Sequence, residues 1–491
     1  MTGMKSALIT AFLGITPALA FGIAVAKHGN ITIDPECVKA CSRLRNIFGD
    51  IYSPGNANVT VWDAKQQETH SACWIQPSST EDVSTILGVI IDTSCRFAIK
   101  GGGHARVPDD SVSAGGVTID LQKMRTVAVS PDRTTVTLGS GHVLLSLYQG
   151  LEKYNLTSVA GRVADVGLGG FVLGGGFSHL SPKYGFAMDN VLEYEVVLPN
   201  ATVAIVNHAT HPDLYFALRG GMNNFGIVTH FTMRAIRQGQ MLAGSRTYST
   251  DNRDAIIHQA YRLTTEWKND TSMAFYYSFG YQQVTDDFIL AVSQEYSRPV
   301  LRPAPFEQLN QIPFESSTVR LGWNSQFSID SASATPPGGR NLFATVTYHP
   351  SADLDRRVQD IMVEEIQSVK TTPGFHPNIV VQPLYEAVVR AGRERGGNAA
   401  VILLTVRWEN AQDDDRMNAL AQRWLERSTA AAKKAGKYHP WLYINYASKE
   451  QDPFRGYGEA NLQRLRRIQS EVDPQGVFTS QGLCRGYFKL H

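Results

Sequence analysis

The pattern of hydrophobic and polar positions changes character near residue 238. Before that point, short apolar runs alternate with segments whose apolar residues recur every three or four positions, which predicts alternating strands and helices. Strands are predicted at residues 97–99, 117–121, 126–129, 135–138, 191–198, 201–207 and 226–229, and helices at 79–91, 143–154 and 214–219. The strands on either side of Pro199 and Asn200 form a hairpin in this interpretation.

After residue 238 the predicted elements are longer and the glycine-rich segments cease. Strands are predicted at residues 275–280, 288–294, 342–348 and 400–408, and helices at 354–369, 383–391, 413–435 and 460–472. The alternation in these strands suits one antiparallel sheet with helices covering one face, so the predicted fold class is α+β. A chain of 491 residues exceeds one ordinary hydrophobic core, and we expect more than one domain.

The first residues have the pattern of a secretory signal peptide. Lys5 precedes a short apolar stretch at residues 7–20, and small residues at 18–20 and 24–26 provide cleavage sites. Pro17 interrupts the stretch, whereas a membrane span needs about 20 continuous apolar residues. We therefore expect removal of residues 1–26 and secretion of the protein. Glycosylation sequons support this route and begin at Asn30, Asn58, Asn155, Asn200 and Asn269.

Four cysteines near the N-terminus suggest two disulfides in an oxidising compartment. Cys37 and Cys41 lie four residues apart in a predicted helix, where their mutual pairing is unfavourable. Of the three possible connectivities we therefore prefer those that join this helix once to Cys73 and once to Cys95. Cys484 stands alone near the other end of the chain.

Composition and charge exclude several classes of partner. The chain carries 46 basic and 45 acidic residues, and it lacks a basic patch with interleaved aromatic residues, which argues against nucleic acid as a partner. Cysteine and histidine residues do not follow the spacing of a zinc site, so we expect no metal. Beyond the N-terminus no apolar segment is long enough for a membrane span, and we expect a monomer that does not bind membranes.

The strongest candidate for chemistry is the triple glycine at residues 101–103, which follows a predicted strand and ends in His104. Glycine backbone can approach an anion such as a pyrophosphate closely, and the imidazole places a nucleophile beside it. Such a string alone is also typical of a tight turn with a surface histidine. A second segment favours a site, because residues 167–176 hold six glycines among large apolar residues. That composition is too apolar for a flexible linker and indicates buried backbone against a flat ligand.

Taken in order, these motifs resemble those of the berberine bridge enzyme-like family, which has the PCMH (vanillyl-alcohol-oxidase) type of FAD-binding fold. The likeness is to its fungal branch of FAD-linked oxidoreductases. The matching segments are residues 100–104, 116–121, 161–163, 166–170, 174–178, 189–191, 213–214, 217–221, 224–229, 443–447, 451–453, 457–458, 461, 465 and 473–474. The resemblance implies a cysteine-containing segment at 27–68, an FAD-binding domain at 69–238, a substrate domain at 239–440 and a segment at 441–491 that returns to the FAD domain.

The resemblance also implies a covalent bond between the imidazole of His104 and the 8α-methyl group of FAD. Many relatives add a second bond through a cysteine, but Val163 stands at the matching position, so we expect a single link. Ala105 replaces the usual serine, and Val166 falls where relatives gate oxygen access, which is compatible with an oxidase. The implied FAD contacts are Lys100, Gly101, Gly102, Gly103, His104, Ala105, Gly161, Val166, Gly167, Gly170, Gly174, Gly176, Ile227 and Asn445.

The family chemistry implies removal of a hydride and a proton from a small organic substrate. Tyr443 and Tyr446 are the candidate catalytic bases, although tyrosines at such positions are also common core residues. A phenol has an ordinary pKa near 10, so a catalytic tyrosine needs a cationic neighbour that lowers this pKa. Arg162 is a candidate to bind substrate or reduced flavin, or else to form a structural ion pair. The glutamate base typical of plant relatives is not evident in residues 382–398.

These inferences predict a secreted oxidase of secondary metabolism with molecular oxygen as electron acceptor. Two alternatives stay open: a carbohydrate or oligosaccharide oxidase, and a flavoprotein that guides cyclisation or only binds its ligand. The missing second cysteine makes an oligosaccharide substrate less favoured. The sequence does not name the substrate, because the substrate domain shares no motif with the family.

Overall fold

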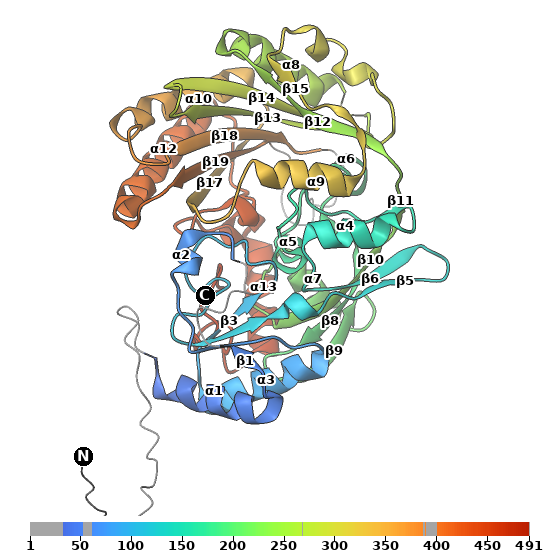
Figure 1. Cartoon of the computed structure of the whole chain (residues 1–491), viewed down its shortest axis with the longest axis vertical. Helices are drawn as coiled ribbons and strands as arrows, with labels where there is room; N and C mark the ends of the chain where they lie inside the picture. The colour runs from blue at the N-terminus through green and yellow to red at the C-terminus, as the bar shows by residue number, and fades with distance from the viewer. Residues whose placement is uncertain (1–32, 53–60, 268, 386–387, 389–399, 491) are drawn as a thin grey trace, which may run out of the picture.

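Figure 1 shows an upper part built on one large sheet and a lower part built on smaller sheets. The computed structural model describes residues 33–52, 61–267, 269–385, 388 and 400–490. Helices and strands segregate into these layers, which confirms the predicted α+β class. The predicted signal peptide and two sequon asparagines, Asn30 and Asn58, lie outside the described residues.

The first small sheet leads into the glycine turn. Its strands run in the order β1 (Ile51–Tyr52), β2 (Cys73–Ile75), β4 (Val117–Asp120) and β3 (Phe97–Lys100). Strands β2 and β3 both pair with β4 in parallel, and α3 (Thr80–Thr93) connects them. The helix begins where predicted, because Ser79 and Asp82 exchange hydrogen bonds in a capping box.

Two disulfides fasten the N-terminal helix α1 (Pro35–Phe48) to this sheet. Cys37 pairs with Cys95 and Cys41 with Cys73, which confirms that the helix cysteines take separate partners. Cys484 is buried and forms no disulfide within the described part of the chain.

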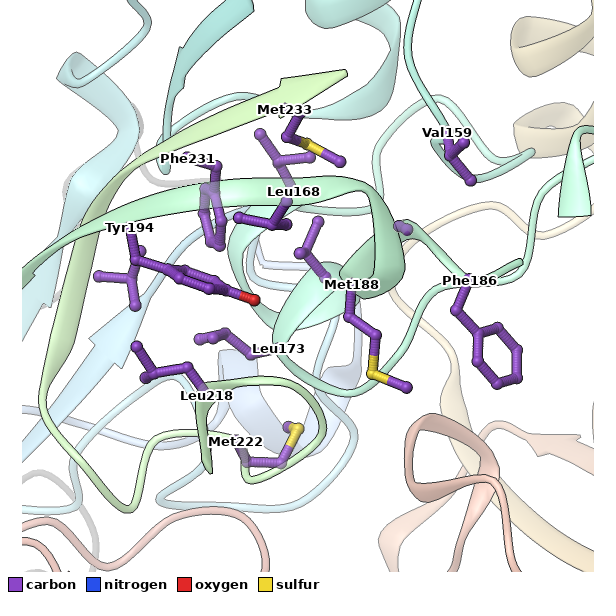
Figure 2. Packing of buried hydrophobic residues seen from close by; sticks show 14 of the residues in the cluster. Val159, Leu168, Leu173, Phe186, Met188, Tyr194, Leu218, Met222, Phe231 and Met233 are labelled. Carbon is purple, nitrogen blue, oxygen red and sulfur yellow. The ribbon is translucent and has the colours of Figure 1, made fainter. Parts of the chain in front are cut away.

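The second small sheet holds the core of the lower part. Its antiparallel strands run in the order β5 (Val127–Val129), β6 (Thr135–Gly139), β10 (Ile227–Arg234), β8 (Val191–Val197) and β9 (Val203–Asn207). Beside it lie α4 (Leu144–Glu152), α5 (Leu168–Leu173), α6 (Ser181–Tyr184) and α7 (Pro212–Leu218), and a short pair of β7 (Leu156–Thr157) and β11 (Ile236–Arg237). Figure 2 shows Leu168 and Leu173 of α5 packed with Tyr194 and Phe231 of the sheet. The glycine-rich segment is therefore part of a packed core.

The upper part is a nine-stranded antiparallel sheet. Its strands in order are β15 (Ser316–Ser317), β12 (Met241–Tyr248), β14 (Asp287–Tyr296), β13 (Met273–Gln282), β18 (His376–Pro383), β19 (Ala400–Trp408), β17 (Arg340–Tyr348) and β20 (Tyr438–His439), and β16 (Arg320–Gly322) also pairs with β12. Helices α8 (Arg253–Glu266), α10 (Ala352–Glu365) and α12 (Asp414–Lys434) cover the outer face in Figure 1. A further helix, α9 (Asn324–Ser333), lies against α4 of the lower part. The four predicted strands thus fall in one sheet with helices on one face, as expected.

One predicted helix in this region is wrong at its start. Pro383 was expected to begin a helix at 383–391, but it is the last residue of strand β18. Within that range, residues 386–387 and 389–391 lie outside the described residues. Strand β18 escapes sequence analysis because Pro377 and Pro383 lie within it, and proline is typical of strand ends and interruptions.

The C-terminal segment packs against the lower part. A loop follows helix α13 (Glu459–Val472). In this loop the carbonyl of Leu483 accepts a hydrogen bond from the backbone N–H of Phe97 in β3 (2.7 Å). The rings of Phe97 and Phe478 meet edge to face, 5.4 Å apart. The end of the chain thereby closes over β3, the strand that leads into the glycine turn.

Candidate active site

The two glycine segments pack backbone against backbone. A Cβ atom added at Gly102 would lie 2.4 Å from the backbone nitrogen of Gly167, and one added at Gly167 would lie 2.2 Å from that of Gly102. Real Cβ atoms do not approach so closely, so glycine is required on both sides. Gly103 also has a φ of +74°, a conformation that favours glycine. The close approach fixes where the next residue, His104, is held.

His104 is enclosed by an aromatic ring and a carboxylate. Trp62 stacks on its imidazole, with ring centroids 4.1 Å apart and planes 11° from parallel. Nε2 lies 3.6 Å from Oδ1 of Asp165, and neither buried atom has a hydrogen-bond partner among the described residues. Burial, followed by the nearby Arg106 cation, lowers the pKa of His104 to about 3. The imidazole is therefore neutral and keeps a nucleophilic lone pair.

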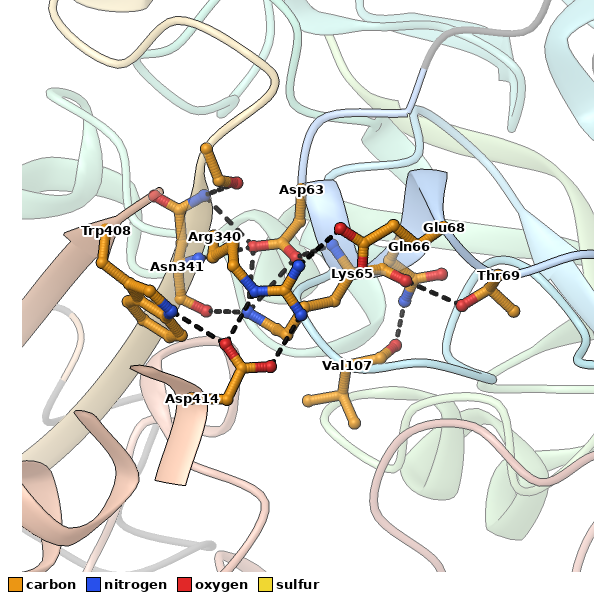
Figure 3. Close-up of polar contacts among 11 residues, drawn as sticks. Asp63, Lys65, Gln66, Glu68, Thr69, Val107, Arg340, Asn341, Trp408 and Asp414 are labelled. Carbon is orange, nitrogen blue, oxygen red and sulfur yellow. Dashed lines mark hydrogen bonds and ion pairs between the residues drawn. The ribbon is translucent and has the colours of Figure 1, made fainter. Parts of the chain in front are cut away.

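The segment that carries Trp62 is anchored to the large sheet, as Figure 3 shows. The Asp63 carboxylate accepts a hydrogen bond from the Asn341 backbone N–H (2.8 Å), and the Lys65 ammonium donates to the Asn341 carbonyl (2.7 Å). The indole N–H of Trp62 donates to the Thr335 carbonyl (2.9 Å). These contacts hold Trp62 between the two parts of the molecule.

Lys100 does not project into open space beside the turn. Its ammonium pairs with the Asp120 carboxylate at 3.0 Å, and both side chains are buried. The pair joins the ends of the parallel strands β3 and β4. Lys100 thus holds the turn in place through Asp120.

The second glycine segment packs against the C-terminal tyrosines. A Cβ atom at Gly174 would lie 2.1 Å from Oδ1 of Asn445, and one at Gly175 would lie 3.1 Å from the Tyr443 ring. Gly175 and Gly176 have φ values of +118° and +89°. These residues therefore need glycine for space, for conformation or for both.

Tyr443 is a buried residue whose oxygen is fully used as an acceptor. The backbone N–H groups of Gly176 (3.0 Å) and Phe177 (3.2 Å) donate to it, as does the side-chain amide of Asn445 (3.0 Å). The side chain is 2% exposed, and burial raises the pKa of its phenol. This environment is that of a structural hydroxyl.

Tyr446 lies in a different environment, three residues further along the chain. Arg162 donates to its hydroxyl oxygen (3.1 Å), and the hydroxyl donates to Oε1 of Gln382 (3.2 Å), to which Arg162 also donates (3.2 Å). Burial raises the pKa of Tyr446 overall, while the Arg162 cation acts to lower it. The cationic neighbour that a catalytic tyrosine needs is thus present at Tyr446. Arg162 also stacks over the Tyr276 ring at 4.3 Å.

Further predicted FAD contacts have the following surroundings in the structure. Ala105 is buried, and the Gly161 carbonyl accepts a hydrogen bond from Tyr148. Val166 is partly buried, a Cβ atom at Gly170 would be 3.7 Å from the Tyr487 hydroxyl, and Ile227 begins β10.

Sequence reasoning missed three residues of this region, Trp62, Asp165 and Gln382, and it gave His179 no role. Asp165 carried a signal, because a carboxylate between Ala164 and Val166 is unusual in an apolar segment. His179 is buried, and its Nε2 has no hydrogen-bond partner among the described residues. Burial and the Arg162 cation lower its pKa to about 4. Trp62 and Gln382 reach the site only through tertiary packing.

The residues present fit the expected FAD. The glycine turn leaves the backbone beside His104 without side chains, which suits a close approach to a cofactor, and the neutral imidazole, whose buried Nε2 has no partner among the described residues, suits covalent attachment. Within the described ranges, no group of three or more His, Cys, Asp or Glu side chains could hold a metal ion. In the same ranges, no helix combines the length and apolarity that a membrane span requires.

Comparison with known proteins agrees with this geometry. Residues 71–207 match the FAD binding domain family, and residues 442–482 match the family described as berberine and berberine like. The FAD-dependent monooxygenase tpcD of Cochliobolus heterostrophus is 34% identical over 442 residues, covering 85% of each chain. The FAD-dependent monooxygenase sdcF of Emericella nidulans is 32% identical over 472 residues, covering 92% of this chain and 98% of that protein.

Solved structures with low sequence identity share the fold. The 6-hydroxy-D-nicotine oxidase of Arthrobacter nicotinovorans superposes with a TM-score of 0.75 at 20% identity, over 90% of this chain and 97% of that chain. Glucooligosaccharide oxidase of Acremonium strictum gives a TM-score of 0.72 at 17% identity, over 90% and 98%. Together with the fungal relatives, the family matches and the paired glycine segments, these findings show that the chain is an FAD-dependent oxidoreductase of the berberine bridge enzyme-like family.

Proposed function

We propose that this enzyme oxidises a small organic substrate by hydride transfer to FAD that is linked to the protein through His104 alone. FAD would supply the two-electron acceptor. Molecular oxygen would then take up these two electrons with two protons and leave as hydrogen peroxide. The observation that carries the proposal is the hydrogen bond from Arg162 to the hydroxyl of Tyr446. It gives the site a phenol beside a fixed positive charge.

Tyr446 is the proposed proton acceptor. When its hydroxyl is ionised, the guanidinium of Arg162 offsets the negative charge, and the phenolate can take a proton from a substrate O–H or N–H group. The carbonyl of Gln382 holds both partners in register through two further hydrogen bonds. Tyr443 is assigned a structural role instead, because three N–H donors already occupy its oxygen.

Secretion is part of the proposal. The two disulfides suit an oxidising compartment. The sequon asparagines Asn155, Asn200 and Asn269 are exposed, as glycan acceptors must be. A covalent link would also keep the cofactor with an enzyme that cannot rebind FAD outside the cell. A small secondary metabolite as substrate rests on the missing second cysteine at Val163.

A second candidate reaction comes from the fungal relatives, which carry the name FAD-dependent monooxygenase. In that reaction one atom of dioxygen enters the product and the other leaves as water with two electrons from a reductant, whereas an oxidase releases both atoms as peroxide. A panel of small alcohols, amines, phenols and sugars is screened for bleaching of the flavin without oxygen. The active compound is then turned over under ¹⁸O₂. One peroxide per product without ¹⁸O supports the oxidase, and ¹⁸O in the product supports the monooxygenase. A flavin that no compound of the panel bleaches contradicts the oxidase.

A further inference from the structure

Two unsatisfied polar atoms face each other beside the glycine turn. Nε2 of His104 and Oδ1 of Asp165 are both buried, lack hydrogen-bond partners among the described residues and lie 3.6 Å apart. Buried polar groups are nearly always paired, so such a couple calls for an explanation. Among the described residues, Asp165 supplies the carboxylate within 4.0 Å of this imidazole.

The backbone enforces this arrangement. His104 follows the turn whose Gly102 meets Gly167, and Asp165 lies two residues before Gly167. A Cβ atom at Gly102 would also lie 3.1 Å from the Asp165 carbonyl oxygen, so the two segments are in register at this point. Trp62 covers the ring of His104 and restricts its rotation. The imidazole therefore presents Nε2 to Asp165.

We propose that Asp165 is a positioning residue for attachment of the flavin to His104. The proposal rests on the covalent link proposed above. Asp165 keeps the proton of the neutral imidazole on Nε2, so that the lone pair is on Nδ1, and it accepts that proton when Nδ1 forms its new bond. The two atoms are 3.6 Å apart in the structure, and we expect them to close to a hydrogen bond that fixes the proton on Nε2 and leaves Nδ1 to react.

The step balances as follows. A bond forms between Nδ1 and the 8α carbon of FAD, and a C–H bond of that carbon breaks with loss of its proton. The imidazole gives up its Nε2 proton towards Asp165, and two electrons remain on the isoalloxazine ring. Dioxygen takes these two electrons and two protons and leaves as hydrogen peroxide. One peroxide is therefore released for each flavin attached.

Electrostatics explains why a carboxylate is needed at this position. Bond formation at Nδ1 makes the ring a cation until Nε2 loses its proton. Burial disfavours that cation, and so does the Arg106 guanidinium, which repels positive charge on His104. Asp165 is the facing group of opposite sign, and its negative charge offsets both effects.

The test compares isosteric pairs at one position. Asp165→Asn and Asp165→Gln remove the charge, whereas Asp165→Glu keeps it. Each purified protein is incubated with added FAD in air and sampled over time. Covalent flavin is measured by fluorescence after acid precipitation, free FAD by release into the supernatant, and folding by thermal unfolding. Asp92→Asn is the control, because Asp92 is an exposed carboxylate that pairs with Arg43.

We expect Asp165→Asn and Asp165→Gln to bind FAD but to attach it at least tenfold more slowly than the wild type. Asp165→Glu should recover part of the rate, Asp92→Asn should match the wild type, and each attached flavin should release one peroxide. Attachment at the wild-type rate in Asp165→Asn overturns the inference. If Asp165→Asn fails to fold, equal rates in the Gln and Glu variants overturn it. A wild type that loses its flavin in acid instead overturns the histidyl link itself.

Discussion

The two sides of the candidate site are built in opposite ways. The cofactor side consists of backbone, where Gly102 meets Gly167 and Gly174 meets Asn445. The substrate side consists of side chains from distant elements, where Arg162, Gln382 and Tyr446 meet through hydrogen bonds. A surface of glycine backbone cannot change without a clash, whereas a cluster of side chains can be rebuilt one residue at a time. The proposed cofactor site is therefore fixed, whereas the proposed substrate site is adaptable.

The largest effect is expected at His104, the residue proposed to carry the covalent link to FAD. His104→Ala should abolish covalent flavin while leaving the fold intact, because only the ring stacked on Trp62 is removed. Acid precipitation should give a yellow pellet with the wild type and a colourless pellet with a yellow supernatant for the variant. A yellow pellet from His104→Ala would place the link on another residue.

Glycine packing on the cofactor side gives the next effect. Gly167→Ala should destabilise the protein by about 3 kcal/mol, since its Cβ would lie 2.2 Å from backbone of the facing turn. Gly169→Ala is the matched control within α5, because its Cβ meets nothing closer than 3.6 Å. We expect the control to be neutral or stabilising by about 0.5 kcal/mol in a helix. Chemical denaturation measures both, and equal stability of the two variants would contradict the close backbone packing.

The two tyrosines test the substrate side. Tyr446→Phe should slow flavin reduction at least tenfold, which is about 1.4 kcal/mol in the barrier, because the phenol beside Arg162 is lost. Tyr443→Phe should instead lower stability by about 1–3 kcal/mol, since three buried N–H groups lose their acceptor. Anaerobic stopped-flow and thermal unfolding separate the two roles. The assignment is wrong if Tyr443→Phe slows reduction more than Tyr446→Phe.

The same contrast explains what the sequence could predict. Glycine turns and the caps of α3 depend on local residues, so residues 101–104 and the start at Ser79 were recognisable. Helix geometry argued against a bond between Cys37 and Cys41, but it did not decide which of the two joins Cys95 and which joins Cys73. On the substrate side Tyr446 and Arg162 were candidates from the resemblance, but Gln382 was not recognisable, because it lies in a strand that contains two prolines. Trp62 also reaches His104 only because Asp63 and Lys65 bind the large sheet.

The smallest expected effect concerns a carboxylate at the outer face of the large sheet. The Asp355 carboxylate is buried there and accepts hydrogen bonds from Tyr277 (2.9 Å) and Tyr348 (2.8 Å). Burial raises its pKa to about 6, and the two donors offset only part of that rise. The folded state therefore holds the proton more tightly than the unfolded state, whose pKa is near 3.8.

The sign follows from this difference in proton binding. Protonated Asp355 favours the folded state at low pH, and this contribution is lost as the pH rises from about 4 to about 6. The slope cannot exceed about 1.4 kcal/mol per pH unit for one group. Asp355→Asn keeps the shape but cannot ionise, so the wild type minus the variant should fall across this window in urea titrations. The rate of flavin reduction should be unaltered, because Asp355 lies outside the proposed site around Tyr446. A flat difference would mean that Asp355 stays ionised in the folded sheet.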